Sequence, residues 1–527
     1  MVYRVPPTPI ELPQIVPLAE SRIVGGMNSY TDPADLPNGI ASKLTGADVK
    51  ADYTMREPGR ITLAGTDPDG NPVLLYTEYS RFDGTNIILR FSRARVDKYS
   101  SGTWTAITGT LSGTDRDRIR FVTTADAVRD YFIFTNNGAD NIKVLNTVAT
   151  SFANLGNAGR YKYIVAFFNR IVAANKVDAI SPNPILLAWS GDFNFTEWNP
   201  LTDISAGSNP LQESQADYAD PITGLFAFAS VMLILRERSL WIATKRPVAS
   251  NPFAFQAAFN YVGCDCPGSA TQTRNGITWY DRRTNQAYSY QVGSTPQEIG
   301  SQIKDDLAGA VTSNDLLWGS YDMVNDRYIL TIPSTTTTNA RIFRYHFPTQ
   351  SWTFSDVNNA YGYYPIDGGI SRLTYDQLTG TYDQLTAANA TYDAIGLLPE
   401  SPPVNHIGFR NGSIQLESPT DTNAPEFVFE SKVYRLPKDD IEISGLMLLI
   451  RPIRDGSLTL EYRKNGRNNW VSWKTLSFTN TERRVRLYAD KLIAANEFQW
   501  RIRCTTGQFQ LMEYRLDISV SPEDKNT

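Results

Sequence analysis

Side chains that commonly carry chemistry are few in this sequence. Among 527 residues there are three cysteines and two histidines. Cys264 and Cys266 form a C-x-C pair, and Cys504 lies far along the chain. Zinc needs four ligands in a tetrahedral arrangement, and the sequence supplies no third or fourth ligand near this pair. The following Pro267-Gly268 therefore favours a structural turn over a metal or redox site, and three cysteines cannot build a disulfide framework.

The two histidines lie in settings that favour packing. His346 stands between Tyr345 and Phe347, and His406 follows a proline-rich stretch. No G-x-S-x-G elbow supplies a nucleophile, and no G-x-x-x-x-G-K-[ST] loop is present to hold a phosphate. We therefore expect no catalytic residue, no metal and no cofactor.

One acidic group could surround a cation if it were helical, namely Glu213, Asp217 and Asp220. Pro210 and Pro221 flank it and favour a solvated loop instead.

Asp67-Pro68-Asp69-Gly70 is typical of a hairpin turn, because the later ligands of a calcium loop are missing. The carboxylate pair of a glycosidase is defined by a distance in space. A glycan-cleaving enzyme therefore remains the alternative to our expectation that the protein is not an enzyme.

The longest apolar run, Leu225–Leu235, spans 11 residues and is broken by Ser230. A bilayer-spanning helix needs about 20. Arg236-Glu237-Arg238 follows the run, and we interpret it as the charge pattern of an edge strand. A cation–π contact with Trp241 is the lesser alternative.

Composition indicates a large, aromatic-rich and mildly acidic protein. Aromatic residues make up 12% of the chain and apolar residues 41%, which is enough for a large core and excludes global disorder. The length suggests about two to four domains. The first twenty residues hold five prolines and no apolar segment of a signal peptide, so we expect a reducing compartment. The net charge is −8 before residue 426 and +3 from residue 426 onward, and neither value indicates tight DNA binding.

The chain divides into five parts by pattern. Residues 1–60 have many prolines and turn signals, which predicts an extended arm that either wraps its own domain or grips a neighbour. Residues 61–355 alternate short Val-, Ile- and aromatic-rich runs with turns. Residues 356–425 form an insert and linker, residues 426–520 a β-sandwich of alternating strands, and residues 521–527 a loose tail.

Tryptophan spacing suggests the architecture of residues 61–355. From Trp198 the next four tryptophans follow at intervals of 43, 38, 39 and 34 residues, and one four-stranded propeller blade needs about 40–50 residues. A mainly β fold with a β-propeller core is therefore predicted, with a pair of β-sandwiches as the alternative. A short helix is expected at Ile299–Leu307.

Three segments in this region pair an aromatic residue and a polar turn with an aromatic strand, and each predicts the hairpin of one blade. They are Tyr280–Tyr290, Tyr321–Leu330 and Tyr345–Phe354.

A short repeat of Thr-Tyr-Asp stands out between residues 373 and 400, a stretch with four acidic residues and no Lys or Arg. Its Tyr-Asp pairs are Tyr375-Asp376, Tyr382-Asp383 and Tyr392-Asp393.

An ordered set of segments resembles the tail nozzle proteins of short-tailed bacteriophages, also called tail tubular protein B or packaged-DNA stabilisation proteins. The segments are GGMNSYTDPADLPNG (Gly25–Gly39), REPGR (Arg56–Arg60), FIFTNNGADNIKVLN (Phe132–Asn146), AFFNRIVAAN (Ala166–Asn175), LLAWSGDFNFTEWNP (Leu186–Pro200), ADPITGLFAFASVMLILRERSLWI (Ala219–Ile242) and GCDCPGSATQTRNGITWYDRRT (Gly263–Thr284).

The resemblance implies a structural virion protein. It would form a homohexameric ring in the virion tail that continues the DNA channel below the portal and the head–tail adaptor, retains packaged DNA and helps its ejection. Implied partners are the adaptor, a tail fibre or spike, a plug or needle protein, and viral DNA that passes without sequence-specific binding. A ring needs interfaces that close by rotation, and we expect the Tyr-Asp pairs to contribute to them. A receptor-binding adhesin and a glycan-cleaving β-propeller are the alternatives.

Overall fold

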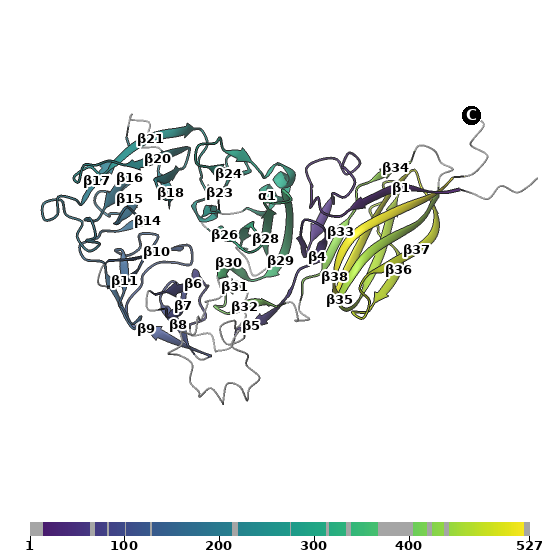
Figure 1. Ribbon diagram of the computed structural model, residues 1–527, viewed down its shortest axis with the longest axis horizontal. Coiled ribbons are helices and arrows are strands. Elements are labelled where there is room, and N and C mark those ends of the chain that lie inside the picture. Colours follow the sequence, from purple (N-terminus) through teal and green to yellow (C-terminus); the bar gives the residue numbers. More distant parts are fainter. Residues whose placement is uncertain are drawn as a thin grey trace, which may run out of the picture.

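The chain is mainly β, with a ring of small sheets beside a larger curled sheet (Figure 1). The computed structural model describes residues 14–63, 69–81, 84–100, 102–126, 129–212, 220–274, 276–311, 316–333, 339–366, 404–418, 424–436 and 442–520. Seven units of four strands follow one another around the ring, which is the arrangement of a β-propeller. Six of these blades are separate sheets, and the remaining one continues into the larger sheet.

The blades follow in chain order, each from its innermost strand outward. Blade 1 consists of β6 (Leu75–Ser80), β7 (Asn86–Phe91), β8 (Val96–Ser100) and β9 (Thr103–Ile107); blade 2 of β10 (Ile119–Ala125), β11 (Asp130–Asn136), β12 (Lys143–Leu145) and β13 (Phe152–Asn154); blade 3 of β14 (Tyr161–Phe167), β15 (Arg170–Lys176), β16 (Asn183–Trp189) and β17 (Gly207–Pro210); blade 4 of β18 (Ile222–Ala227), β19 (Val231–Arg236), β20 (Ser239–Lys245) and β21 (Phe253–Asn260).

Blade 5 consists of β22 (Thr271–Gln272), β23 (Gly276–Asp281), β24 (Gln286–Gln291) and β25 (Gln297–Glu298); blade 6 of β26 (Trp318–Asp322), β27 (Arg327–Ile332), β28 (Asn339–His346) and β29 (Ser351–Asn358); blade 7 of β30 (Ala360–Ile366), β31 (Val404–Phe409), β32 (Ile414–Ser418) and β5 (Gly59–Thr62). A short 3-10 turn, η2 (Pro267–Ser269), precedes blade 5, and a second, η3 (Ser301–Ile303), leads into the helix α1 (Lys304–Ala310) after it. The helix expected at Ile299–Leu307 is therefore present a few residues later. No helix among the described residues is long and apolar enough to span a membrane.

Turn residues explain the tight connections within blades. Phe168 and Asn169 join β14 to β15 with φ angles of 48° and 58°. Two residues with positive φ make a turn whose twist matches that of the flanking strands. The Asn137-Gly138 turn after β11 has the same handedness, with φ angles of 56° and 76°.

The N-terminal arm closes the ring. Strand β5 pairs antiparallel with β32, with Ile61 opposite Leu416, and so supplies the outer strand of blade 7. Strand β1 (Gln14–Arg22) runs antiparallel to the last strand of the chain, with Gln14 opposite Val520. The sequence left open whether the arm wraps its own domain or grips a neighbour. Its described residues wrap their own domain, since they pair with strands of their own chain.

The C-terminal β domain is one sheet that curls into a half-barrel beside the propeller (Figure 1). Its strands are β33 (Phe427–Glu430), β34 (Tyr434–Arg435), β35 (Glu442–Lys464), β36 (Val471–Phe478), β37 (Val485–Ala494) and β38 (Glu497–Val520). The two long strands β35 and β38 pair along nearly their whole length, and irregular pairing between Leu449 and Thr459 divides the ladder in two. Bulges of this kind bend a sheet. A single curled sheet therefore encloses the core, which the sequence predicted to lie between the two sheets of a sandwich.

The arm joins the two β domains through three short strands, β2 (Lys43–Thr45), β3 (Ala47–Val49) and β4 (Thr54–Arg56). Strand β2 lies between β29 of the propeller and β33 of the C-terminal domain, so that the sheet is continuous from one to the other. Trp352 of β29 is fully buried here, its ring Nε1 donates to the carbonyl oxygen of Ile299 at 2.6 Å, and its own carbonyl accepts from the amide of Met27 at 3.0 Å. The two domains and the arm therefore share one core.

Buried ion pairs add to this junction. Glu57 of the arm binds Arg344 of β28 through two bonds of 2.7 and 3.2 Å, and both side chains are 2% exposed. Asp48 of β3 binds Arg327 of β27 at 3.1 Å. Burial acts to raise the pKa of Asp48, but the charges of Arg327 and Lys50 outweigh it and hold the pKa below its ordinary value. The arm is thus bound to the propeller by charge as well as by β pairing.

The blade hairpins correct one sequence-based interpretation. Tyr280–Tyr290 falls on β23 and β24 of blade 5, as expected of a blade hairpin. Tyr321–Leu330 and Tyr345–Phe354, however, fall on successive hairpins of the same blade 6. The ring also takes in strands on both sides of 61–355, namely β5 and β30–β32.

Candidate functional site

An axial cavity of about 930 Å³ opens at the centre of the propeller, and all seven blades contribute to its lining. The contributing residues lie on or beside the innermost strands, from β6 round to β30. This volume is within the range of small-molecule binding sites. The axial cavity is therefore the candidate functional site of the described residues.

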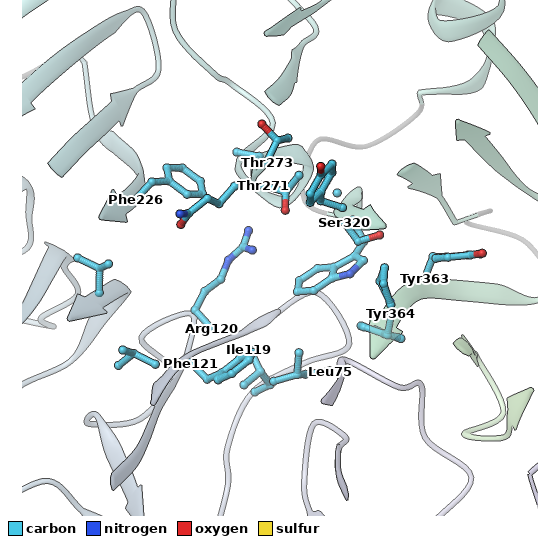
Figure 2. Close-up of a pocket in the computed structure, with 18 of the residues that line it drawn as sticks. Leu75, Ile119, Arg120, Phe121, Phe226, Thr271, Thr273, Ser320, Tyr363 and Tyr364 are labelled. Atoms are coloured by element: carbon cyan, nitrogen blue, oxygen red, sulfur yellow. The ribbon is translucent and has the colours of Figure 1, made fainter. Parts of the chain in front are cut away.

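Arg120 of β10 occupies the centre of the axial cavity (Figure 2). Its guanidinium lies 5.1 Å from the centre of the Trp318 ring, and its Nη2 donates to the carbonyl oxygen of Pro267 at 2.7 Å. Burial lowers the pKa of Arg120, and the neighbouring charge of Arg118 adds to this effect. Because Arg120 belongs to blade 2 and Pro267 leads into blade 5, their hydrogen bond crosses the propeller axis.

Arg118 also forms hydrogen bonds across the propeller axis. Its Nη2 donates to the carbonyl oxygens of Leu316, before blade 6, and Tyr361, in blade 7, at 2.7 and 2.8 Å. The guanidinium also lies 4.3 Å from the centre of the Tyr361 ring. Arg120 of β10 and Arg118 just before it thus tie blade 2 to three blades that are not its neighbours.

The rest of the axial cavity offers aromatic faces and hydroxyl groups. The aromatic side chains are Tyr76, Phe121, Phe226, Trp318, Tyr321, Tyr363 and Tyr364. Hydroxyl groups belong to Thr271, Thr273 and Ser320 among others (Figure 2). A second cation, Arg274, lies at the exposed edge. No Asp or Glu is present among the described lining residues. Stacking, hydrogen bonding and attraction of negative charge are the chemistry that this arrangement supports.

The C-x-C pair lies in a packed turn. Cys264 and Cys266 are both fully buried, and the Cys264 thiol lies 3.2 Å from the carbonyl oxygen of Cys266. Within the described part of the chain, no group of three or more His, Cys, Asp or Glu residues is placed to hold a metal ion.

We expect the three thiols to resist modification in the folded protein. Burial raises the pKa of Cys264 to about 12 and also raises the pKa values of Cys266 and Cys504. Because the thiolate is the reactive form, a disulfide reagent at neutral pH should label none of them within minutes, and all three after unfolding in denaturant. Rapid labelling of the native protein, measured by mass spectrometry, would contradict this burial.

Both histidines are packed in the described structure. His346 is 8% exposed, and burial lowers its pKa. The ring of His406 in blade 7 lies 4.8 Å from that of Tyr76 in blade 1. The expectation of packing holds for both, and His406 contributes to the seam where the ring closes.

Asp220 and Asp69, the described members of the two acidic groups noted in the sequence, have structural partners. Asp220 is 9% exposed and accepts from the amide of Arg238 at 2.6 Å and from the hydroxyl of Ser239 at 2.5 Å. The expectation of a solvated acidic loop is therefore wrong for Asp220, whereas Glu213 and Asp217 lie outside the described residues. Asp69 accepts a bond of 2.7 Å from the buried Arg90, and Asp67 is outside the described residues.

The charge pattern at Arg236 has a different origin from the one expected. Arg236 is fully buried, its Nε donates to the carbonyl oxygen of Asp220 at 2.7 Å, and its guanidinium lies 5.3 Å from the centre of the Trp241 ring. The interpretation as an exposed edge charge is wrong, and the cation–π alternative is confirmed.

The expected interface residues, Tyr375, Asp376, Tyr382, Asp383, Tyr392 and Asp393, lie outside the described residues. The strands on either side of them are described, and Ile366 and Val404 stand opposite each other in β30 and β31. The segment therefore begins and ends at one point of blade 7.

Sequence reasoning missed Arg118 and Arg120. A signal was present, because arginine recurs at every second position from Arg116 to Arg120, the alternation typical of one face of a strand. In the structure only Arg120 belongs to β10, and the other two lie in the segment that leads into it. Such alternation usually marks a solvent-exposed face, and nothing local indicates that this face lies at the axis of a propeller.

Comparisons with known proteins give no sequence relative. A scan against protein families finds no match, and a search of curated proteins finds none either. Among solved structures, the chain is similar to a quinonprotein alcohol dehydrogenase-like protein of Bacteroides thetaiotaomicron, with 10% identity and a TM-score of 0.30 over 54% of this chain and 66% of that one. It is also similar to an auxiliary nutrient binding protein of the same organism, with 10% identity and a TM-score of 0.34 over 68% of this chain and 76% of that one. The chain thus spans about two thirds of the length of the first. The description of this chain as a β-propeller rests on its own sheets.

Proposed function

We propose that this chain is a structural subunit of the tail nozzle of a short-tailed bacteriophage, and that six copies form a ring around a DNA channel. The support from sequence is the ordered set of segments named above. In the fold the segments from Phe132 onward build blades: AFFNRIVAAN covers the turn and most of the hairpin of β14 and β15, and the segment Ala219–Ile242 includes β18, β19 and the start of β20. The adaptor, a fibre or spike and a plug or needle would then be the ring's partners.

The structural observation behind the proposed ring is that hydrogen bonds bridge the axis of the propeller. Arg118 and Arg120 cross it with hydrogen bonds to the main chain of blades 5, 6 and 7. The cavity beside them holds about 930 Å³. A DNA duplex does not fit through such an axis, so a DNA channel has to lie between copies of the chain. A closed ring with heterologous interfaces is the arrangement that provides one.

Rigid coupling of the two β domains also favours a load-bearing role. The continuous sheet through β29, β2, β33 and β38 and the buried pair of Glu57 with Arg344 make the propeller and the C-terminal domain one unit. A subunit that transmits force along a tail would need such a junction, whereas a flexible linker would suit a mobile binding module.

The test is the size and shape of the purified assembly. We expect mass photometry to show a species of six times 58.9 kDa, and negative-stain images to show six-fold rings. Mass spectrometry of purified virions should detect the chain. A chain that stays monomeric even with the adaptor protein, and is absent from virions, would contradict the proposal.

A deletion of Leu373–Ile395 serves as the matched variant in that test. Because Ile366 and Val404 are paired neighbours, a short linker between them should leave the propeller folded by circular dichroism. If the Tyr-Asp pairs contribute to the ring interface, this variant stays monomeric. If the variant still forms rings, the Tyr-Asp repeat is not needed for the ring interface, and the nozzle proposal stands.

The axial cavity supports an adhesin-like binding propeller as the second candidate function. Its aromatic faces and hydroxyl groups are suited to a sugar. Binding to a glycan array that is lost in Phe226→Ala, by a chain that remains monomeric, would favour this candidate over the nozzle.

A further inference from the structure

A second, smaller pocket adjoins the axial cavity and is rich in positive charge. This basic pocket of about 70 Å³ is lined by Arg116, Arg118, Arg120 and Lys162, together with Asn137 and the turn at Pro267. Arg120 lines both the basic pocket and the axial cavity. A ligand in one would therefore be within reach of the other.

Three cations of the basic pocket, Arg118, Arg120 and Lys162, take part in none of the ion pairs of the described structure. Asp117, next to Arg118 in the chain, accepts from the side-chain amide of Asn137 at 3.0 Å and from the backbone amide of Thr114 at 2.7 Å, and it does not line the pocket.

Arg118 also has unused hydrogen-bonding capacity. It is 5% exposed, and its Nη2 is held by the two main-chain carbonyl oxygens described above. Its Nε and Nη1 are buried and have no hydrogen-bond partner. A buried guanidinium with open donors and no counter-charge is costly, and an anion in the basic pocket, which Arg118 lines, would supply the counter-charge.

We propose that the basic pocket binds an oxyanion group, namely a phosphate, sulfate or carboxylate, in contact with Arg120 and Lys162. Guanidinium groups match such anions in geometry and charge. The volume fits one small group, because a water molecule takes about 30 Å³. The anion is either a free ion or the terminal group of a larger ligand whose body lies in the axial cavity, which Arg120 also lines. The site does not depend on ring formation.

The experiment titrates the full-length protein with inorganic phosphate, using sodium chloride of equal ionic strength as the reference. We expect phosphate to raise the Tm beyond the chloride value and to give a saturable heat in calorimetry. In Lys162→Met the phosphate affinity should fall about tenfold or more, which is the loss of one charge-assisted hydrogen bond. Lys143→Met, in the neighbouring blade 2 and outside the pocket, removes the same charge and should bind phosphate as the wild type does.

A second measurement needs no variant. Acetylation of lysines in the wild-type protein, followed by mass spectrometry, should be slowed by phosphate at Lys162 and unchanged at Lys143. This result decides the matter if Lys162→Met does not fold. The proposal is overturned if phosphate has no effect beyond chloride, if both variants lose affinity equally, or if phosphate does not protect Lys162.

A parallel titration with glucose 6-phosphate distinguishes the two sources of the anion. Tighter binding than inorganic phosphate identifies a terminal phosphate with its body in the axial cavity. Equal or weaker binding identifies a free ion. Binding of either supports the basic pocket, and binding of neither excludes it.

Discussion

Replacing Arg344 by methionine is expected to lower the free energy of unfolding by about 3–5 kcal/mol, the usual cost of breaking a buried ion pair. Arg344 and Glu57 are both 2% exposed and joined by two hydrogen bonds. Methionine fills part of the volume but leaves the Glu57 carboxylate buried with its principal cation gone. Urea unfolding at neutral pH, followed by tryptophan fluorescence, measures the loss.

Arg341→Met is the matched control for this effect. Arg341 lies on the same strand, β28, and pairs with Asp356 at 3.0 Å, but the two side chains are 32% and 42% exposed. Exposed pairs contribute about 0–1 kcal/mol, so this variant should unfold close to the wild type. The double variant Glu57→Gln with Arg344→Met should recover much of the loss, because the two opposite charges of the pair are removed together. Equal losses in Arg344→Met and Arg341→Met would refute the buried-pair account.

Trp352→Ala should cost about 3–5 kcal/mol as well, through a cavity at the junction of arm, propeller and C-terminal domain. The ring of Trp352 packs against Tyr328, Phe343 and Tyr345. Its loss also removes the hydrogen bond to Ile299. Because the arm is bonded to the main chain at the same residue, we expect the arm to become sensitive to limited proteolysis in this variant.

Trp470→Ala is the comparison for the junction. Trp470 lies between β35 and β36, is half-buried, and contacts Arg463 and Arg501 through cation–π interactions of 4.9 and 4.4 Å. Contacts of this kind contribute about 0.5–1 kcal/mol at exposed sites, so its loss should be small and the arm should stay protected. An arm that remains protease-resistant in Trp352→Ala would show that β pairing alone holds it.

The sequence predicted the propeller for a partly different reason from the true one. The tryptophans behind the spacing argument occupy no equivalent position: Trp241 lies on a third strand, Trp279 on a second, Trp318 on a first and Trp352 on a fourth. The last interval, from Trp318 to Trp352, lies within blade 6, and the others join different positions of successive blades. The spacing therefore pointed to the right fold without marking equivalent positions in successive blades.

What the sequence could not indicate was long-range pairing. Strand β5 is recognisable as a short extended segment, but its partner β32 lies more than 350 residues later, and no local pattern connects them. Arg118 shows the same difficulty at the candidate site, because its main-chain acceptors at Leu316 and Tyr361 are 198 and 243 residues away. Buried charges of this kind resemble surface charges until the fold brings their partners together.

Because the first described strand pairs with the last, the arm can reach its folded position only late in translation. On the ribosome, β1 emerges long before β38, its partner, is made. At about 5–20 residues per second, the interval between Arg22 and Val520 is roughly 25 to 100 s. During that time β1 is an unsatisfied strand edge, and blade 7 lacks β32 until residue 418 has been made. The arm can therefore be fixed in place only after translation has passed β38.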